Sequence, residues 1–153
     1  MTHTTENILI TAILCIIIFI PIYLAVRSAR IKKAKKVSNE LSKIEKDLNL
    51  SLQAIEQFYS FVIAIDRAKK IIINMALKDY SLQLIDLKGV TDCTLDEKKQ
   101  GKATQQLQLV LLGKDQQPIH HIVFYRQYVD NEGHLKRTAQ VAAQWEVMIK
   151  AII

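Results

Sequence analysis

The chain begins with a long apolar run that carries no charged side chain. Residues 8–26 read ILITAILCIIIFIPIYLAV and contain no Asp, Glu, Lys or Arg. In a helix, these 19 residues rise roughly 28 Å, which is close to the hydrocarbon thickness of a bilayer. A soluble helix that is apolar on every face would need a large protein around it, and this chain has only 153 residues. The run therefore predicts a transmembrane helix over residues 8–26.

Basic residues follow this run closely, whereas no Lys or Arg precedes it. The six are Arg27, Arg30, Lys32, Lys33, Lys35 and Lys36. The positive-inside rule places this flank in the cytoplasm and leaves residues 1–7 as a short extracytoplasmic N-terminus. We accordingly expect a single-pass protein of the cell (inner or plasma) membrane whose C-terminal domain is cytoplasmic.

The excess of positive charge is confined to this flank. The chain has 21 basic and 15 acidic residues, and without the six flanking bases 15 of each sign remain. Such a balance argues against nucleic acid as a partner, because nucleic-acid binders spread Lys and Arg over a folded face. The lipid bilayer, with anionic headgroups at the basic flank, is the expected partner. The alternative is that these bases only set the topology.

Residues 27–36 form the basic juxtamembrane segment, and residues 37–59 predict an amphipathic stalk helix. No Gly or Pro lies between Ser28 and Phe58. The apolar positions of a 3-4 repeat are Leu41, Ile44, Leu48, Ile55 and Phe58. Because such a stripe must be buried, it packs on the following domain or forms a homo-oligomer through the stalk. The sequence leaves both alternatives open.

The periodicity changes to near two at Ser60. Six strands are predicted, at 60–65, 71–75, 81–85, 90–95, 105–112 and 119–125. Helical spacing returns over residues 135–152, where Val141, Trp145 and Ile149 recur at intervals of three to four. We therefore predict an α+β fold: the transmembrane and stalk helices, then a small antiparallel β-barrel or sandwich of six to seven strands over residues 60–153, capped by a C-terminal helix.

This order of elements resembles the pleckstrin-homology-like (PH-like) superfold, in the version found in small bacterial proteins of unknown function. FVIAIDRAKKIIINM resembles the opening hairpin, SLQLIDLKGVTDCTL the next strand pair, and AAQWEVMIKAI the capping helix. The resemblance implies seven strands, so one more is expected, in 76–87 or 125–129. It also implies a domain that binds phosphoinositides, peptides or proteins, or that scaffolds an assembly. Its basic first loop corresponds here to Arg67, Lys69 and Lys70.

The sequence shows no catalytic, metal-binding or cofactor-binding motif. His120 and His121 are adjacent in a predicted strand, so they point to opposite faces and cannot chelate one metal together. Cys93 is expected to be a small buried hydrophobic residue. Tyr125 and Tyr128, beside Arg126, either mark an exposed binding edge or are ordinary strand residues. We expect no enzyme activity and no cofactor.

The sequence thus predicts a membrane-anchored, non-catalytic binding or scaffold protein that presents a small PH-like domain to an unidentified protein partner. One alternative is an accessory subunit of a larger membrane complex. The other is a module that binds anionic lipid through Arg67, Lys69 and Lys70.

Overall fold

The computed structural model describes the backbone of residues 2–101 and 103–153, and the side chains of residues 16–29, 31–101 and 103–153. The chain divides into two compact units, residues 1–44 and 45–153. The helices are α1 (Thr2–Asp47) and α2 (Leu135–Lys150). The strands are β1 (Gln53–Gln57), β2 (Phe61–Asp66), β3 (Ile71–Ala76), β4 (Leu82–Asp86), β5 (Asp92–Gln100), β6 (Ala103–Leu112) and β7 (Pro118–Arg126).

Helix α1, whose last turn belongs to the second unit, corrects the membrane prediction. Among the residues that the structure describes, no helix has both the length and the apolar composition needed to cross a membrane. Residues 8–15 of the predicted span lie outside the described side chains. The transmembrane helix over 8–26, and the single-pass membrane location derived from it, are therefore wrong for the described chain.

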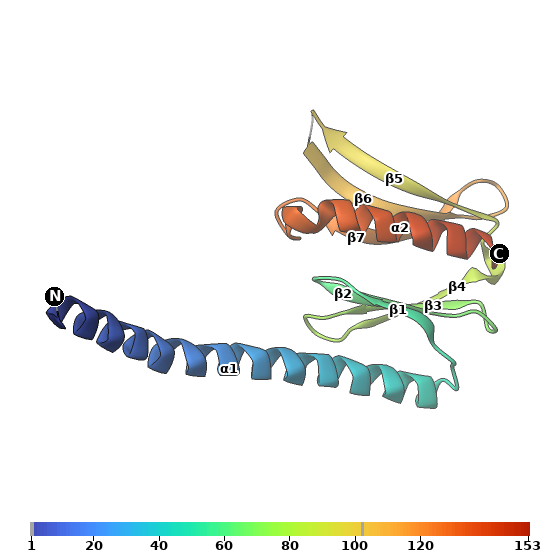
Figure 1. The fold of residues 1–153 in the computed structure, drawn as a ribbon. Coiled ribbons are helices and arrows are strands. Elements are labelled where there is room, and N and C mark those ends of the chain that lie inside the picture. Colours follow the sequence, from blue (N-terminus) through green and yellow to red (C-terminus); the bar gives the residue numbers. More distant parts are fainter. Residues whose placement is uncertain (1, 102) are drawn as a thin grey trace. The chain divides into compact units, whose positions relative to one another are not determined.

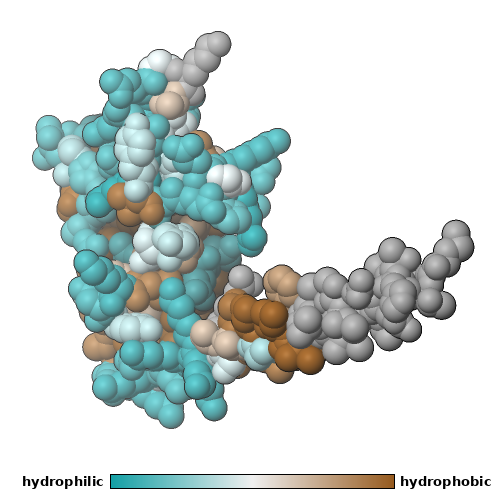
Figure 2. All heavy atoms as spheres, turned by 90° about the vertical axis from the view of Figure 1, so that its left-hand side faces the viewer, coloured by the Kyte–Doolittle hydropathy of each residue, from teal (hydrophilic) through white to brown (hydrophobic). Residues whose placement is uncertain are grey.

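The surface of α1 divides into an apolar and a basic stretch. Hydrophobic residues gather on α1 in Figure 2, and the described ones from Ile16 to Val26 are exposed. The described members of the predicted basic cluster, Arg27, Lys32, Lys33, Lys35 and Lys36, follow on the same helix and are also exposed. The side chain of Arg30 lies outside the described residues. Helix α1 runs without interruption through the predicted span, the basic segment and the first part of the predicted stalk.

The helix ends earlier than the predicted stalk. Asn49 adopts a left-handed backbone conformation with φ 52°. The N–H of Leu50 donates to the carbonyl of Glu45 at 2.8 Å, and the N–H of Asn49 donates to the carbonyl of Lys46 at 3.3 Å. This pattern is a Schellman motif, in which Asn replaces the more usual Gly. The stalk helix over 37–59 is therefore wrong after Asp47, and residues 53–57 form β1 instead.

The seven strands of the second unit form two antiparallel sheets (Figure 1). The first sheet has the order β1-β2-β3-β4 and the second the order β5-β6-β7. Helix α2 packs along the second sheet. The sheets stay open and do not close into a barrel, so the predicted fold class is corrected to two helices and two open antiparallel sheets. The additional strand is β1, which lies outside both ranges suggested for it.

One hydrophobic core joins both sheets and α2. Its fully buried members include Ile63, Ile65, Ile72 and Ile85 from the first sheet, Leu107, Leu109 and Leu111 from the second, and Ala142 and Ile149 from α2. Burying a side chain of this size contributes about 1.5–3 kcal/mol, so this face of α2 holds the helix in place. The expected burial of Cys93 is confirmed, at 0 % exposure.

Candidate functional site

The predicted binding loop is the turn between β2 and β3. Arg67 and Lys69 are exposed, and Lys70 is half-buried with a left-handed φ of 56°. The Lys69 ammonium group donates to the carbonyl of Leu48 at 3.2 Å and to that of Asn49 at 2.6 Å. These carbonyls lie at the C-terminal end of α1, where a basic side chain is stabilising. Lys69 therefore already has partners within the protein.

The buried carboxylate of Asp66 holds the same turn through hydrogen bonds. It is only 1 % exposed, and its two carboxylate oxygens accept the N–H groups of Ser51 at 2.8 Å and Lys69 at 2.9 Å. Burial raises the pKa of this carboxyl, but the N–H groups of Ser51, Lys69 and Ala68 and the Lys69 charge together outweigh burial and hold the pKa below its ordinary value. The carboxylate thus joins the turn to the segment that follows α1.

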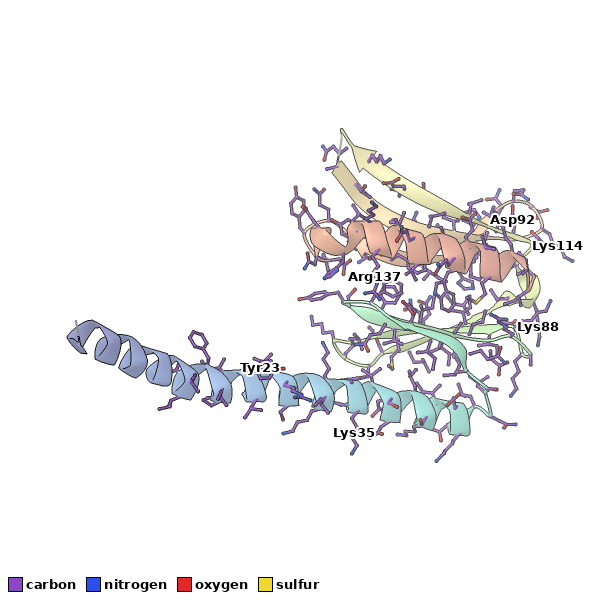
Figure 3. The ribbon with its side chains drawn as sticks, in the orientation of Figure 1. Tyr23, Lys35, Lys88, Asp92, Lys114 and Arg137 are labelled. Carbon is purple, nitrogen blue, oxygen red and sulfur yellow. The ribbon has the colours of Figure 1, made fainter. Side chains whose placement is uncertain are left out.

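Lys69 and Lys70 also line a hollow of about 600 Å³ that includes Lys88, labelled in Figure 3, and the apolar side chains of Leu87 and Val90. The hollow gathers three lysines, but the only described hydrogen bonds of the Lys69 ammonium are internal. Binding of an anionic headgroup by Arg67, Lys69 and Lys70 stays a prediction.

A second hollow, here called the Tyr125 pocket, has a different character. Its volume is about 220 Å³. The end of β1, the end of β7 and the N-terminal half of α2 enclose it. The lining residues are Glu56, Gln57, Phe58, Tyr59, Phe124, Tyr125, Asp130, Asn131, His134, Arg137, Thr138 and Val141.

Aromatic rings form its rigid wall. Phe58 stacks on Phe61 with 4.6 Å between ring centroids, and Phe124 meets Phe58 edge-on at 5.2 Å. Edge-to-face and stacked pairs of this kind contribute about 0.5–1.5 kcal/mol beyond the burial of their area. The wall is therefore fixed before any ligand arrives.

A β-bulge brings Tyr125 to this wall. Tyr125 pairs with Leu107 and Val123 pairs with Gln108, so Phe124 is an extra residue in β7. A bulge of this kind re-aims the side chains that follow it. As a result Phe124 and Tyr125 are both buried, at 2 % exposure each. The interpretation of Tyr125 as an exposed edge residue is therefore wrong, whereas Tyr128 is 91 % exposed.

The Tyr125 hydroxyl is a donor without an acceptor among the described residues. The structure gives it no hydrogen bond within the described chain, and Asn74 Oδ1 is the one fully enclosed, unpartnered side-chain oxygen or nitrogen in that part. The hydroxyl therefore keeps access to solvent through the pocket. Burial, and then the charges of Glu132 and Asp130, raise the pKa of Tyr125 above its ordinary value. The group stays protonated at neutral pH and can donate.

Two charged side chains of the pocket also lack partners within the described chain. Arg137, labelled in Figure 3, lies in the first part of α2, and Glu56 lies in β1; neither has an ion pair or a hydrogen bond there. Asp130 differs, because its carboxylate accepts from the Ser60 hydroxyl at 3.0 Å and from the N–H of Arg126 at 2.9 Å. Beside its apolar wall, the pocket thus offers donors and an acceptor that have no partner within the described chain.

The size of the Tyr125 pocket limits what it can hold. A cavity of about 150 Å³ can bind benzene, whereas pockets for drug-sized ligands and cofactors span roughly 300–1,000 Å³. At about 220 Å³, this pocket suits one apolar side chain. No group of three or more potential metal ligands occurs within the described residues.

The Cys93 thiol is unsuited to nucleophilic chemistry. Burial is the main cause that raises its pKa to about 11. Its sulfur lies 3.5 Å from the carbonyl oxygen of Glu146 on α2.

Compared with known protein families, curated proteins and solved structures, the chain shows no match. The resemblance to the PH-like superfold therefore stays a prediction. Within residues 60–153, which the resemblance covers, the described structure has six strands, and the seventh, β1, lies before this range.

Proposed function

We propose that this protein is a non-catalytic binding module and that the Tyr125 pocket receives one apolar side chain of a partner protein. The proposal rests on one observation: Tyr125, which is only 2 % exposed, lines an aromatic-walled pocket, and its hydroxyl has no hydrogen-bond partner among the described residues. Buried polar groups in folded proteins normally have partners. Water can reach this hydroxyl through the pocket, and a ligand acceptor would take the place of that water.

The neighbouring groups support a protein ligand. The aromatic wall matches an apolar side chain, while Tyr125 and Arg137 can donate to a backbone carbonyl and Glu56 can accept from a backbone N–H. Few convergent polar groups around an apolar cavity are typical of a binding site. Such a site needs no reactive nucleophile, in keeping with a binding role.

The test is titration of the full chain with N-acetyl-phenylalanine methylamide, followed by NMR. We expect saturable shifts of the Phe58, Phe124 and Tyr125 resonances, and much smaller shifts with N-acetyl-alanine methylamide. Thr138→Phe, which fills the pocket from α2, should abolish binding. Gln140→Phe is the matched control, because Gln140 is exposed on the same helix and does not line the pocket. Equal binding to the Thr138→Phe variant would refute the proposal.

A further inference from the structure

The edge of β1 beside the Tyr125 pocket has free backbone hydrogen-bonding groups. β1 is the first strand of its sheet and pairs only with β2 in the described structure. The N–H of Phe58 donates to the carbonyl of Phe61 at 2.8 Å, and the next pair is Gln57 with Val62. In an antiparallel ladder, hydrogen-bonded pairs alternate with pairs whose N–H and C=O point outward. The backbone N–H and C=O of Gln57 therefore point away from β2.

The same edge is irregular nearer the start of β1. The β1–β2 register shifts between Gln53 and Glu56, and Ala54 has a left-handed φ of 45°. A bulge of this kind prevents regular pairing along an edge strand. Only the end of β1 from Glu56 onward remains available, and Glu56 and Gln57 are the β1 residues that line the pocket. The available edge and the pocket thus coincide.

We propose that the partner segment is an extended peptide that pairs with Gln57 at the free edge of β1 and inserts one apolar side chain into the Tyr125 pocket. This inference rests on the proposed function and adds the peptide backbone to it. Edge pairing supplies main-chain hydrogen bonds, and a pocket for alternate side chains supplies specificity. Glu56 and Arg137, which also line the pocket, are the expected partners of the peptide backbone groups that do not face β1.

The matching chemistry favours a peptide over a free small molecule. A peptide carries a donor and an acceptor in every residue. The site offers the Gln57 carbonyl and Glu56 as acceptors, and the Gln57 N–H, Tyr125 and Arg137 as donors. Because the pocket itself has room for about one side chain, most contacts of a longer ligand must come from the edge.

The experiment measures fluorescence polarisation of labelled seven-residue peptides with the full chain. The probe has a central Phe flanked by Ser and Thr, and its control has a central Ala. We expect the Phe peptide to bind about tenfold more tightly than N-acetyl-phenylalanine methylamide, as one or two added backbone hydrogen bonds would produce. N-methylation of the peptide should weaken binding at alternate residues only, because a paired strand directs every second amide to its neighbour.

Two variants of β1 test the edge directly. Gln57→Pro removes the outward N–H without removing a hydrogen bond to β2, and Pro is tolerated at such an edge position. It should reduce the affinity for the Phe peptide to that of the single residue, whereas Gln53→Ala, in the same strand but outside the pocket, should leave it unchanged. If Gln57→Pro does not fold, the N-methylated peptides test edge pairing instead, because only pairing predicts that N-methylation weakens binding at alternate residues.

The outcomes separate the two proposals. If the single residue binds in the Tyr125 pocket but elongation or N-methylation has no effect, edge pairing is refuted and the proposed function stands. If neither the single residue nor the peptide binds, both are refuted.

Discussion

The β2–β3 turn and the Tyr125 pocket both carry charged side chains, but those charges have different partners. In the turn, Asp66 accepts two backbone N–H groups and Lys69 donates to two carbonyls. In the pocket, the Tyr125 hydroxyl and the Arg137 guanidinium have no such partner within the described chain. A cluster of bases with internal partners is therefore a weaker sign of a binding site than a polar group at the wall of a cavity that has no partner within the described chain.

The largest expected effect is loss of the Asp66 carboxylate. Asp66→Ala leaves the N–H groups of Ser51 and Lys69 without their acceptor in a buried setting, so the free energy of unfolding should fall by about 3 kcal/mol. Urea unfolding measures this change. Asp115→Ala is the control, because Asp115 is exposed, has no hydrogen bond within the described chain and should have only a small effect. A stability equal to the wild type would show that the turn is not structural.

The pH dependence of stability should report the same carboxylate. The pKa of Asp66 is lower in the folded than in the unfolded chain. The ionised carboxylate therefore stabilises the fold fully above the ordinary Asp pKa of about 3.9. This stabilisation is lost as the pH falls through the pKa of Asp66 in the folded chain. Asp66→Asn should therefore flatten the acid limb of the stability curve. Urea unfolding from pH 6 downward provides the comparison, and an unchanged slope would contradict the assignment.

Lys69→Met should have the next largest effect. The free energy of unfolding should fall by about 1 kcal/mol, because the substitution removes two exposed hydrogen bonds at the end of α1. Arg67→Met, in the same turn, should leave the stability unchanged. Thermal unfolding distinguishes them. Equal stabilities of the two variants would mean that Lys69 has no more structural role than Arg67.

Tyr125→Phe should change stability least, by less than about 0.5 kcal/mol, since no hydrogen bond is lost. The same substitution should nevertheless weaken binding of N-acetyl-phenylalanine methylamide severalfold. A marked destabilisation measured in urea would show that the hydroxyl has an internal role instead.

The regular elements could be predicted from the sequence, whereas the pocket could not. Periodicity predicted the β2–β3 hairpin, the buried face of Leu107, Leu109 and Leu111, and α2, and these are confirmed. β1 was missed because Asn49, rather than Gly or Pro, ends α1. The strand β5 also extends to Gln100, beyond the end of the strand predicted at 90–95.

The position of Tyr125 depends on one irregularity. Strict alternation places it on the opposite face from Phe124, and only the bulge in β7 puts both side chains in the core. A bulge depends on how two strands pair, which no local pattern reveals. Likewise, the partners of Lys69 lie 20 and 21 residues away in the chain. Sequence reasoning could name these bases but not what they contact.

The central claim is that the Tyr125 pocket, and not the β2–β3 turn, is the binding site. Mapping of chemical-shift changes on the full chain during titration with the Phe-centred peptide tests it most directly. We predict changes at Gln57, Phe58, Tyr125 and Arg137, with Arg67, Lys69 and Lys70 unaffected. Changes confined to the turn, with the pocket resonances unmoved, would contradict the account.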